Sequence, residues 1–114
     1  MVMKVLEIVA GDSARHAGGS GKSGLAAHTQ ALKRAGADVH LLLRGSAVRY
    51  GVRSQDGLDR DLVSLVQEGT NVYYIEDDAR ARRIAADQLF AGLKPVRSKD
   101  LPALLDRYKQ VWRW

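Results

Sequence analysis

The stretch that decides the fold is Val72-Tyr73-Tyr74-Ile75, which is followed directly by Glu76-Asp77-Asp78. Four consecutive β-branched or aromatic residues without polar alternation predict a short strand that is buried on both faces. Strands of that kind belong to parallel sheets. In open parallel α/β sheets, ligands bind at the carboxyl ends of the strands. Residues 75–78 are therefore predicted to lie at a functional edge, although they contain no self-evident nucleophile.

Apolar runs and helical spacing alternate on both sides of this stretch. The pattern predicts further strands over residues 4–10, 38–43, 93–96 and 109–114. It predicts helices over residues 25–35, 58–66, 79–86 and 99–108, with a single helical turn at 47–50. The helix over 79–86 is expected to start at the acids that precede it, since the helix dipole favours acids in the first turn. This order of elements predicts a three-layer α/β/α domain with a mainly parallel sheet of five strands.

Capping and turn residues mark several boundaries of these elements. Gly36 follows Lys33 and Arg34 and is predicted to end the first helix in a left-handed conformation. Pro95 places its strand at an edge of the sheet. Ser98 is predicted to be the N-cap of the last helix.

Length and composition limit the class of protein. With 114 residues, 46% of them hydrophobic and 27% charged, we expect one domain over residues 1–114. No apolar run approaches the roughly 20 residues of a membrane span, and no secretory signal pattern follows Met1, so we expect no membrane association and a cytoplasmic location. The sequence contains no cysteine, which excludes disulfides, thiolate metal sites and a thiol nucleophile.

The loop after the first strand is rich in glycine. Gly21-Lys22-Ser23 matches the end of a phosphate-binding loop, but His16 stands where the first glycine of that pattern belongs. We therefore expect an anion, held by Ser20, Lys22 and backbone N–H groups, rather than nucleotide hydrolysis. His16 and His28 have no histidine or carboxylate at ligand spacing, so surface or structural roles are expected for both.

Acidic residues are predicted to gather at the same edge of the sheet. Asp12 follows the first strand, and Asp77 and Asp78 follow the third, which would place all three at the ends of adjacent strands. No catalytic residue, metal ligand or cofactor is predicted. The candidate ligand-binding residues are Asp12, His16, Ser20, Lys22, Asp77 and Asp78.

Taken in order, the predicted elements resemble the DsrE/DsrF-like sulfur-relay family, with its TusD-like and YchN-like members. The residues that carry the resemblance are 32–39, 41–43, 45–48, 65–73, and 81–82 with 84. The resemblance implies a trimer or hexamer, or a complex with a cysteine-bearing sulfurtransferase homologue. It also implies that sulfur carriers of the family hold a persulfide on a cysteine just after the third strand, where Ile75 and Asp78 stand here.

Because a thiol is absent, the resemblance implies a non-catalytic or regulatory subunit in intracellular sulfur relay or sulfur oxidation rather than an enzyme. Tyr73, Tyr74, Trp112 and Trp114 support assembly independently, since Tyr and Trp are enriched in protein contacts, with core packing as the alternative.

Three other functions stay open at this point. The first is a small-molecule or anion-binding enzyme that uses residues 18–24 and the strand-end acids. The second is the N-terminal half of a two-domain glycosyltransferase, which the short chain disfavours. The third is a nucleic-acid-binding protein, suggested by the net charge of +5. We do not expect nucleic-acid binding, because the densest basic group, residues 80–83, is flanked by acids on a helix.

Overall fold

The computed structural model describes residues 3–10, 24–52, 58–89 and 91–113. The strands are β1 (Lys4–Ala10), β2 (Asp38–Arg44), β3 (Val72–Ile75), β4 (Leu93–Val96) and β5 (Gln110–Arg113). The α-helices are α2 (Gly24–Arg34), α3 (Leu58–Gln67), α4 (Glu76–Ala81) and α5 (Leu101–Leu105). Short 3-10 helices are η1 (Gly45–Gly51), η2 (Ala86–Gln88) and η3 (Ser98–Asp100).

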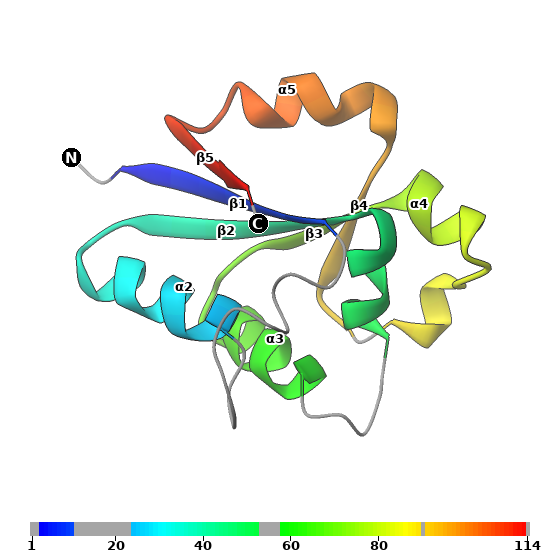
Figure 1. Ribbon diagram of the computed structural model, residues 1–114, viewed down its shortest axis with the longest axis horizontal. Coiled ribbons are helices and arrows are strands. Elements are labelled where there is room, and N and C mark those ends of the chain that lie inside the picture. Colours follow the sequence, from blue (N-terminus) through cyan, green and yellow to red (C-terminus); the bar gives the residue numbers. More distant parts are fainter. Residues whose placement is uncertain (1–2, 11–23, 53–57, 90, 114) are drawn as a thin grey trace.

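The five strands form one sheet in the order β4-β3-β2-β1-β5, and every pair of neighbouring strands is parallel. The chain moves stepwise from β1 to β4 at one edge of the sheet. It then crosses the sheet through α5 and places β5 at the opposite edge, beside β1 (Figure 1). The α/β class and the five-stranded parallel sheet predicted from the sequence are confirmed.

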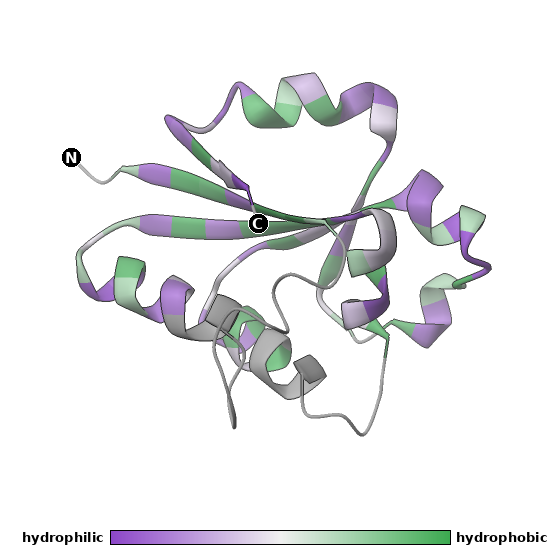
Figure 2. Cartoon of the chain, viewed as in Figure 1, coloured by the Kyte–Doolittle hydropathy of each residue, from purple (hydrophilic) through white to green (hydrophobic). Residues whose placement is uncertain are grey.

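Helices cover both faces of the sheet. Helices α2 and α3 lie on one face and α5 lies on the other, as Figure 1 shows. The inner strands β1 and β2 each have five consecutive buried residues, whereas the edge strand β4 has none. Figure 2 shows apolar residues along the strands and a mixture of polar and apolar residues along the helices. Pro95 lies in edge strand β4, where its missing N–H interrupts no inner ladder, as predicted.

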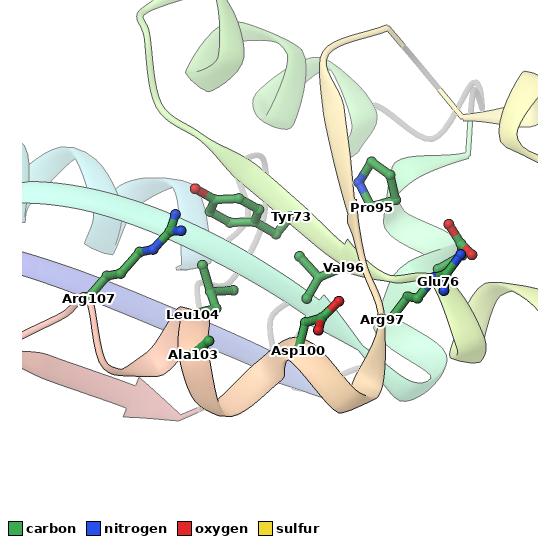
Figure 3. Close-up of a pocket in the computed structure, with 9 residues that line it drawn as sticks. All are labelled: Tyr73, Glu76, Pro95, Val96, Arg97, Asp100, Ala103, Leu104 and Arg107. Atoms are coloured by element: carbon green, nitrogen blue, oxygen red, sulfur yellow. The ribbon is translucent and has the colours of Figure 1, made fainter.

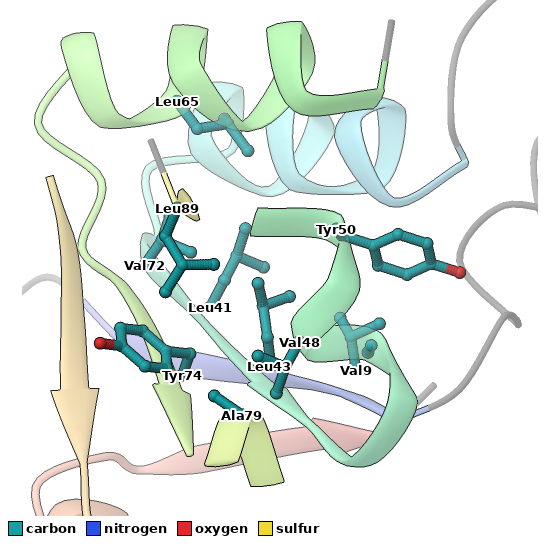
Figure 4. Close-up of a cluster of buried hydrophobic side chains, with 11 residues drawn as sticks. Val9, Leu41, Leu43, Val48, Tyr50, Leu65, Val72, Tyr74, Ala79 and Leu89 are labelled. Atoms are coloured by element: carbon teal, nitrogen blue, oxygen red, sulfur yellow. The ribbon is translucent and has the colours of Figure 1, made fainter. Parts of the chain in front are cut away.

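Alternate side chains of β2 fill two separate cores. Leu41 and Leu43 enter the larger cluster on the α2 and α3 face, together with Tyr74 and Leu65 (Figure 4). Leu42 enters the cluster beneath α5. Burying a side chain of this size stabilises the fold by about 1.5–3 kcal/mol relative to leaving it exposed. The continuous Leu41–Leu43 run therefore reflects a strand that packs on both sides.

Three helices end in the same hydrogen-bonded motif. After α2, the Ala37 N–H donates to the Leu32 carbonyl and Gly36 has a φ of 94°, as predicted for this residue. The end of α3 repeats this arrangement at Gly69, with a φ of 95°. After α4, the Ile84 N–H donates to the Ala79 carbonyl, and the left-handed position is occupied by Arg83, with a φ of 57°.

Two predicted helices are shorter than expected. The run 79–86 was predicted as helix, but α4 covers residues 76–81 and the chain turns at Arg83, which brings Ile84 against the larger core. The prediction that Ser98 caps a helix over 99–108 is wrong. Ser98 begins η3, no side-chain cap bond is made there, and α5 begins only at Leu101. Pro102 lies in the first turn of α5, where it is tolerated.

Arg83 supplies a test of backbone strain. A non-glycine residue in the left-handed region costs roughly 1–2 kcal/mol, which glycine avoids. We therefore expect Arg83→Gly to raise the free energy of unfolding by about 0.5–1 kcal/mol, measured by urea denaturation. Arg82→Gly is the matched control. Arg82 has a φ of −102°, so glycine there relieves nothing and is expected to destabilise. Equal effects of the two substitutions would contradict the strain at Arg83.

Candidate functional site

The corner after β3 is where the sequence predicted a functional edge. Strand β3 passes directly into α4, so Glu76, Asp77 and Asp78 form the first turn of that helix. Carboxylates at this position are stabilised by the positive end of the helix dipole. The prediction that a helix starts at the acids is confirmed.

Both aspartates at this corner accept hydrogen bonds from backbone N–H groups of other segments. Asp78 Oδ2 accepts from the Gly45 N–H at 2.8 Å, which joins α4 to the carboxyl end of β2. Asp77 Oδ2 accepts from the Ser98 N–H at 2.9 Å, which joins α4 to the start of η3. The backbone N–H and side chain of Ser98 hold the pKa of Asp77 below its ordinary value. The two carboxylates therefore connect the loops that follow β2 and β4.

The predicted ligand set is only partly described. Asp12, His16, Ser20 and Lys22 lie outside the described residues, so their grouping stays a prediction. The expectation that Asp12 and the two later aspartates follow adjacent strands is wrong, because β2 lies between β1 and β3. Asp77 and Asp78 bond to different segments, Ser98 and Gly45, rather than sharing a partner.

A groove of about 500 Å³ opens next to this corner, between α5 and the adjacent face of β3 and β4 (Figure 3). Val96 and Leu104 form part of its apolar lining, and Tyr73 lies toward one end. Glu76 and Arg97 lie toward the other end. Its size falls within the range of small-molecule pockets.

Charges around the groove are of both signs. Glu76 is paired with Arg80 at 2.7 Å, on the surface of α4. Asp100 and Arg107 also line the groove, and neither forms an ion pair within the part of the chain that the structure describes. Among those same residues, no group of three or more His, Cys, Asp or Glu side chains is arranged to hold a metal ion.

A buried carboxylate lies on the opposite face of the sheet, and the sequence analysis missed it. The Glu7 side chain, in the middle of β1, is 0% exposed. His28 Nδ1 hydrogen-bonds to Glu7 Oε1, and the Thr29 hydroxyl donates to Glu7 Oε2 at 2.5 Å. Burial raises the pKa of Glu7 more than the bonds from Thr29 and His28 lower it. The earlier conclusion that His28 has no carboxylate partner is therefore wrong.

One signal in the sequence could have pointed to this cluster. Glu7 is the single acidic residue in the run Lys4–Ala10, which otherwise reads as a buried strand. Because buried carboxylates are paired or hydrogen-bonded, such a residue requires a donor from a covering helix. Both donors come from consecutive positions of α2, the helix that follows β1 in the chain.

The other histidine that the structure describes, His40, bonds to groups within and beside the sheet. His40, on β2, donates from Nε2–H to Asp38 Oδ1 at 3.0 Å and accepts at Nδ1 from the Asn71 N–H at 2.8 Å. Its ring also meets the edge of Tyr108, at a centroid distance of 5.9 Å. Burial lowers the pKa of His40, although Asp38 opposes this. His40 thus connects β2 to the residue before β3 as a neutral imidazole with both ring nitrogens engaged.

The sheet order, the two helical layers and the strand-end corner together define a DsrE/YchN-like α/β fold. The chain is similar to the YchN protein from E. coli, with a TM-score of 0.78 and 19% sequence identity, over 99% of this chain and 100% of that one. It is also similar to MTH1491 from Methanobacterium thermoautotrophicum, a protein of unknown function, with a TM-score of 0.71 and 17% identity over the full length of both chains. No protein-family model matches the sequence, and no curated protein matches it either.

The bond from Gly45 to Asp78 can be tested by mutation. Asp78→Ala leaves the partly buried Gly45 N–H without its acceptor and is expected to lower the free energy of unfolding by about 1–3 kcal/mol. Asp78→Asn keeps a carbonyl acceptor and should recover part of that loss. Denaturant unfolding of both variants measures the difference. If Asp78→Ala is as stable as the wild type, this carboxylate does not connect α4 to the end of β2.

His40 predicts how stability depends on pH. Because its pKa is lowered by folding, the unfolded chain takes up a proton first, near the ordinary value of 6.5. The stabilisation by neutral His40 is complete above that pH and is lost as the pH falls through the lowered pKa of the folded state.

The matched variant is His40→Asn, which keeps an acceptor near the Asn71 N–H but does not titrate. We expect the stability difference between wild type and variant to shrink from pH 7 to pH 5 in urea titrations. A difference that is constant over this range would contradict a neutral His40.

Proposed function

We propose that this protein is a non-catalytic subunit of sulfur relay or sulfur oxidation, which acts by assembling with copies of itself or with a cysteine-bearing homologue. The proposal is supported by the DsrE/YchN-like fold and by the absence of cysteine from the sequence. Without a thiol, the chain cannot carry a persulfide itself. Its contribution would then be to shape, hold or regulate a partner that carries the persulfide.

The observation that carries the proposal is the engagement of the carboxylates at the β3 corner. The family resemblance places a sulfur-carrying cysteine at this corner, at the level of Ile75 to Asp78. Here Asp77 and Asp78 accept N–H groups from the loops after β4 and β2. A carboxylate at this point also repels a thiolate, which is the reactive form in sulfur transfer. The corner is thus suited to holding loops together rather than to accepting sulfur.

The alternative enzyme is less well supported. It required the strand-end acids to bind a ligand, but the two described acids of that set are bonded to backbone N–H groups of separate segments. The glycine-rich loop at residues 18–24 lies outside the described residues.

The surface offers one feature in favour of assembly. Trp112, on the edge strand β5, is 44% exposed, although tryptophan is among the residues enriched at protein contacts. Tyr74, by contrast, is buried in the larger core, so the core-packing alternative holds for it. Trp114 lies outside the described residues. No helix within the described ranges is both long and apolar enough to cross a membrane.

Native mass spectrometry of untagged protein purified from its source tests the proposal. We expect either a mass that is a multiple of the single chain, with three or six copies favoured by the resemblance, or a mixed complex whose partner contains a thiol-reactive cysteine. Labelling the sample with iodoacetamide before denaturation identifies that partner, since this chain cannot be labelled on cysteine. A strict monomer without partner at micromolar concentration would overturn the proposal.

A further inference from the structure

The segment that forms η3 and α5 presents one stripe of side chains to the groove beneath it. Four of the lining residues follow the spacing i, i+3, i+4 and i+7, which places them on one side of a helix: Asp100, Ala103, Leu104 and Arg107. The helical conformation extends along this range, since Asp100 and Asp106 have right-handed helical dihedrals and the Arg107 N–H donates to the Leu104 carbonyl at 3.1 Å. The stripe is acidic at one end, apolar in the middle and basic at the other end.

The two charged ends of this stripe are held apart. Seven residues of helix rise by about 10 Å along the axis, so Asp100 and Arg107 share a side of the segment without lying next to each other. Neither forms an ion pair with any residue of the described ranges 3–10, 24–52, 58–89 and 91–113. In Figure 3 the Arg107 side chain extends into the groove, toward Leu104 and Tyr73. A small molecule that carries both charges can therefore lie between the two ends.

The other charges of the groove are already compensated by neighbouring groups. Glu76 pairs with Arg80 at 2.7 Å. Arg97 lies at the same end of the groove as Glu76 (Figure 3). After the hydrogen bonds from Ser98, the charges of Arg80 and Arg97 also lower the pKa of Asp77. This leaves the two ends of the stripe as the charges with which a ligand can pair.

The wall opposite α5 supplies an apolar surface and a hydroxyl donor. Val96 of β4 packs against the same apolar cluster as Leu104. Tyr73 of β3 lies at the Arg107 end of the groove (Figure 3), and its hydroxyl is hydrogen-bonded to that of Tyr108. Two hydroxyls carry two protons and a bond between them uses one, so the pair keeps a second donor for an anion beside Arg107.

We propose that this groove binds a free α-amino acid with an apolar side chain. The ligand carboxylate pairs with the Arg107 guanidinium, whose N–H fork matches the two carboxylate oxygens, and also accepts from the tyrosine pair. The ligand ammonium group pairs with Asp100, and the ligand side chain packs on Leu104 and Val96. A volume of about 500 Å³ is sufficient for an amino acid as large as phenylalanine.

This site requires neither a cysteine nor a second chain. It is therefore independent of the assembly role proposed above, and either can fail without the other. Native mass spectrometry tests the assembly, whereas ligand titration tests the groove.

Isothermal titration calorimetry with phenylalanine and two analogues tests the requirement for both charges. The analogue 3-phenylpropionate lacks the ammonium group and phenethylamine lacks the carboxylate, whereas both keep the phenyl ring. We expect L-phenylalanine to bind saturably, with one ligand per chain. Each analogue is expected to bind about tenfold more weakly or worse, because it loses a charge-assisted hydrogen bond.

Two substitutions assign each ligand charge to its partner. Arg107→Gln is expected to weaken the binding of phenylalanine about tenfold but not that of phenethylamine, which has no carboxylate to lose contact. Asp100→Asn is expected to weaken the binding of phenylalanine to a similar extent but not that of 3-phenylpropionate, which has no ammonium group. Circular dichroism and thermal melting establish that each variant is folded before it is titrated.

Two matched controls remove the same charges elsewhere. Asp106→Asn lies on the same segment beside the stripe, and Arg34→Gln lies at the end of α2 on the other face of the sheet. Both residues are exposed, and neither lines the groove. We expect both control variants to bind phenylalanine with the wild-type Kd.

Nuclear magnetic resonance of the wild type locates the ligand without any substitution. Saturation with L-phenylalanine is expected to shift the resonances of Ala103 and Leu104 but not those of Leu41, which lies in the larger core. The proposal is overturned if neither L-phenylalanine nor L-leucine binds to the wild type, or if either analogue binds as tightly as phenylalanine. It is also overturned if Arg107→Gln or Asp100→Asn binds phenylalanine as the controls do.

Discussion

Neither face of the inner strands β1 and β2 is exposed to solvent, and this constraint governs the placement of every polar side chain on them. β1 and β2 are covered by α2 and α3 on one side and by α5 on the other. Among their buried positions, Glu7 and His40 are the polar residues. Since an unpaired polar group in such a core is costly, each must find its partners inside the protein. They do so in two different ways.

His40 is satisfied within the sheet itself, whereas Glu7 is satisfied from a helix. Asp38 lies two residues before His40 on the same strand, and the Asn71 N–H precedes the neighbouring strand β3, so the His40 bonds reinforce strand pairing. The partners of Glu7 come instead from α2, so its bonds fix how that helix sits on the sheet. A lone carboxylate serves this purpose at a high desolvation cost.

Much of the architecture follows from local sequence, because apolar period and helix ends are local properties. The alternation of elements, the edge position of Pro95, the left-handed exit at Gly36 and the helix start at the acids were all readable from neighbouring residues. The turn at Arg83 could not be predicted in this way. Its left-handed conformation depends on Ile84 reaching the core, whereas local propensity favours a continued helix. Ser98 was misassigned for a related reason: its side chain, as well as its backbone N–H, bonds to Asp77, which lies 21 residues earlier.

The candidate sites show the same difference between features set by neighbouring residues and contacts between residues far apart in sequence. The corner after β3 was located correctly, since strand ends are marked by composition. The hydrogen bonds at this corner were not predicted, because the backbone partners of Asp77 and Asp78 lie on loops far away in sequence. The Glu7 cluster was missed because strand periodicity treats β1 as an apolar unit and because His28 was compared only with residues near it in the chain.

The two faces of the sheet carry separate groups of polar contacts. On the α5 side, Asp77 joins the β3 corner to η3, and so ties that corner to the segment that leads into α5. On the α2 side, Glu7 and His28 lie beside the surface at edge strand β5. Because β1 belongs to both faces through alternate side chains, Leu6 and Ile8 pack beneath α5 while Glu7 between them points to α2. A change in assembly on one side would thus leave the geometry of the other largely intact, since the inner strand that they share is held rigidly by both cores.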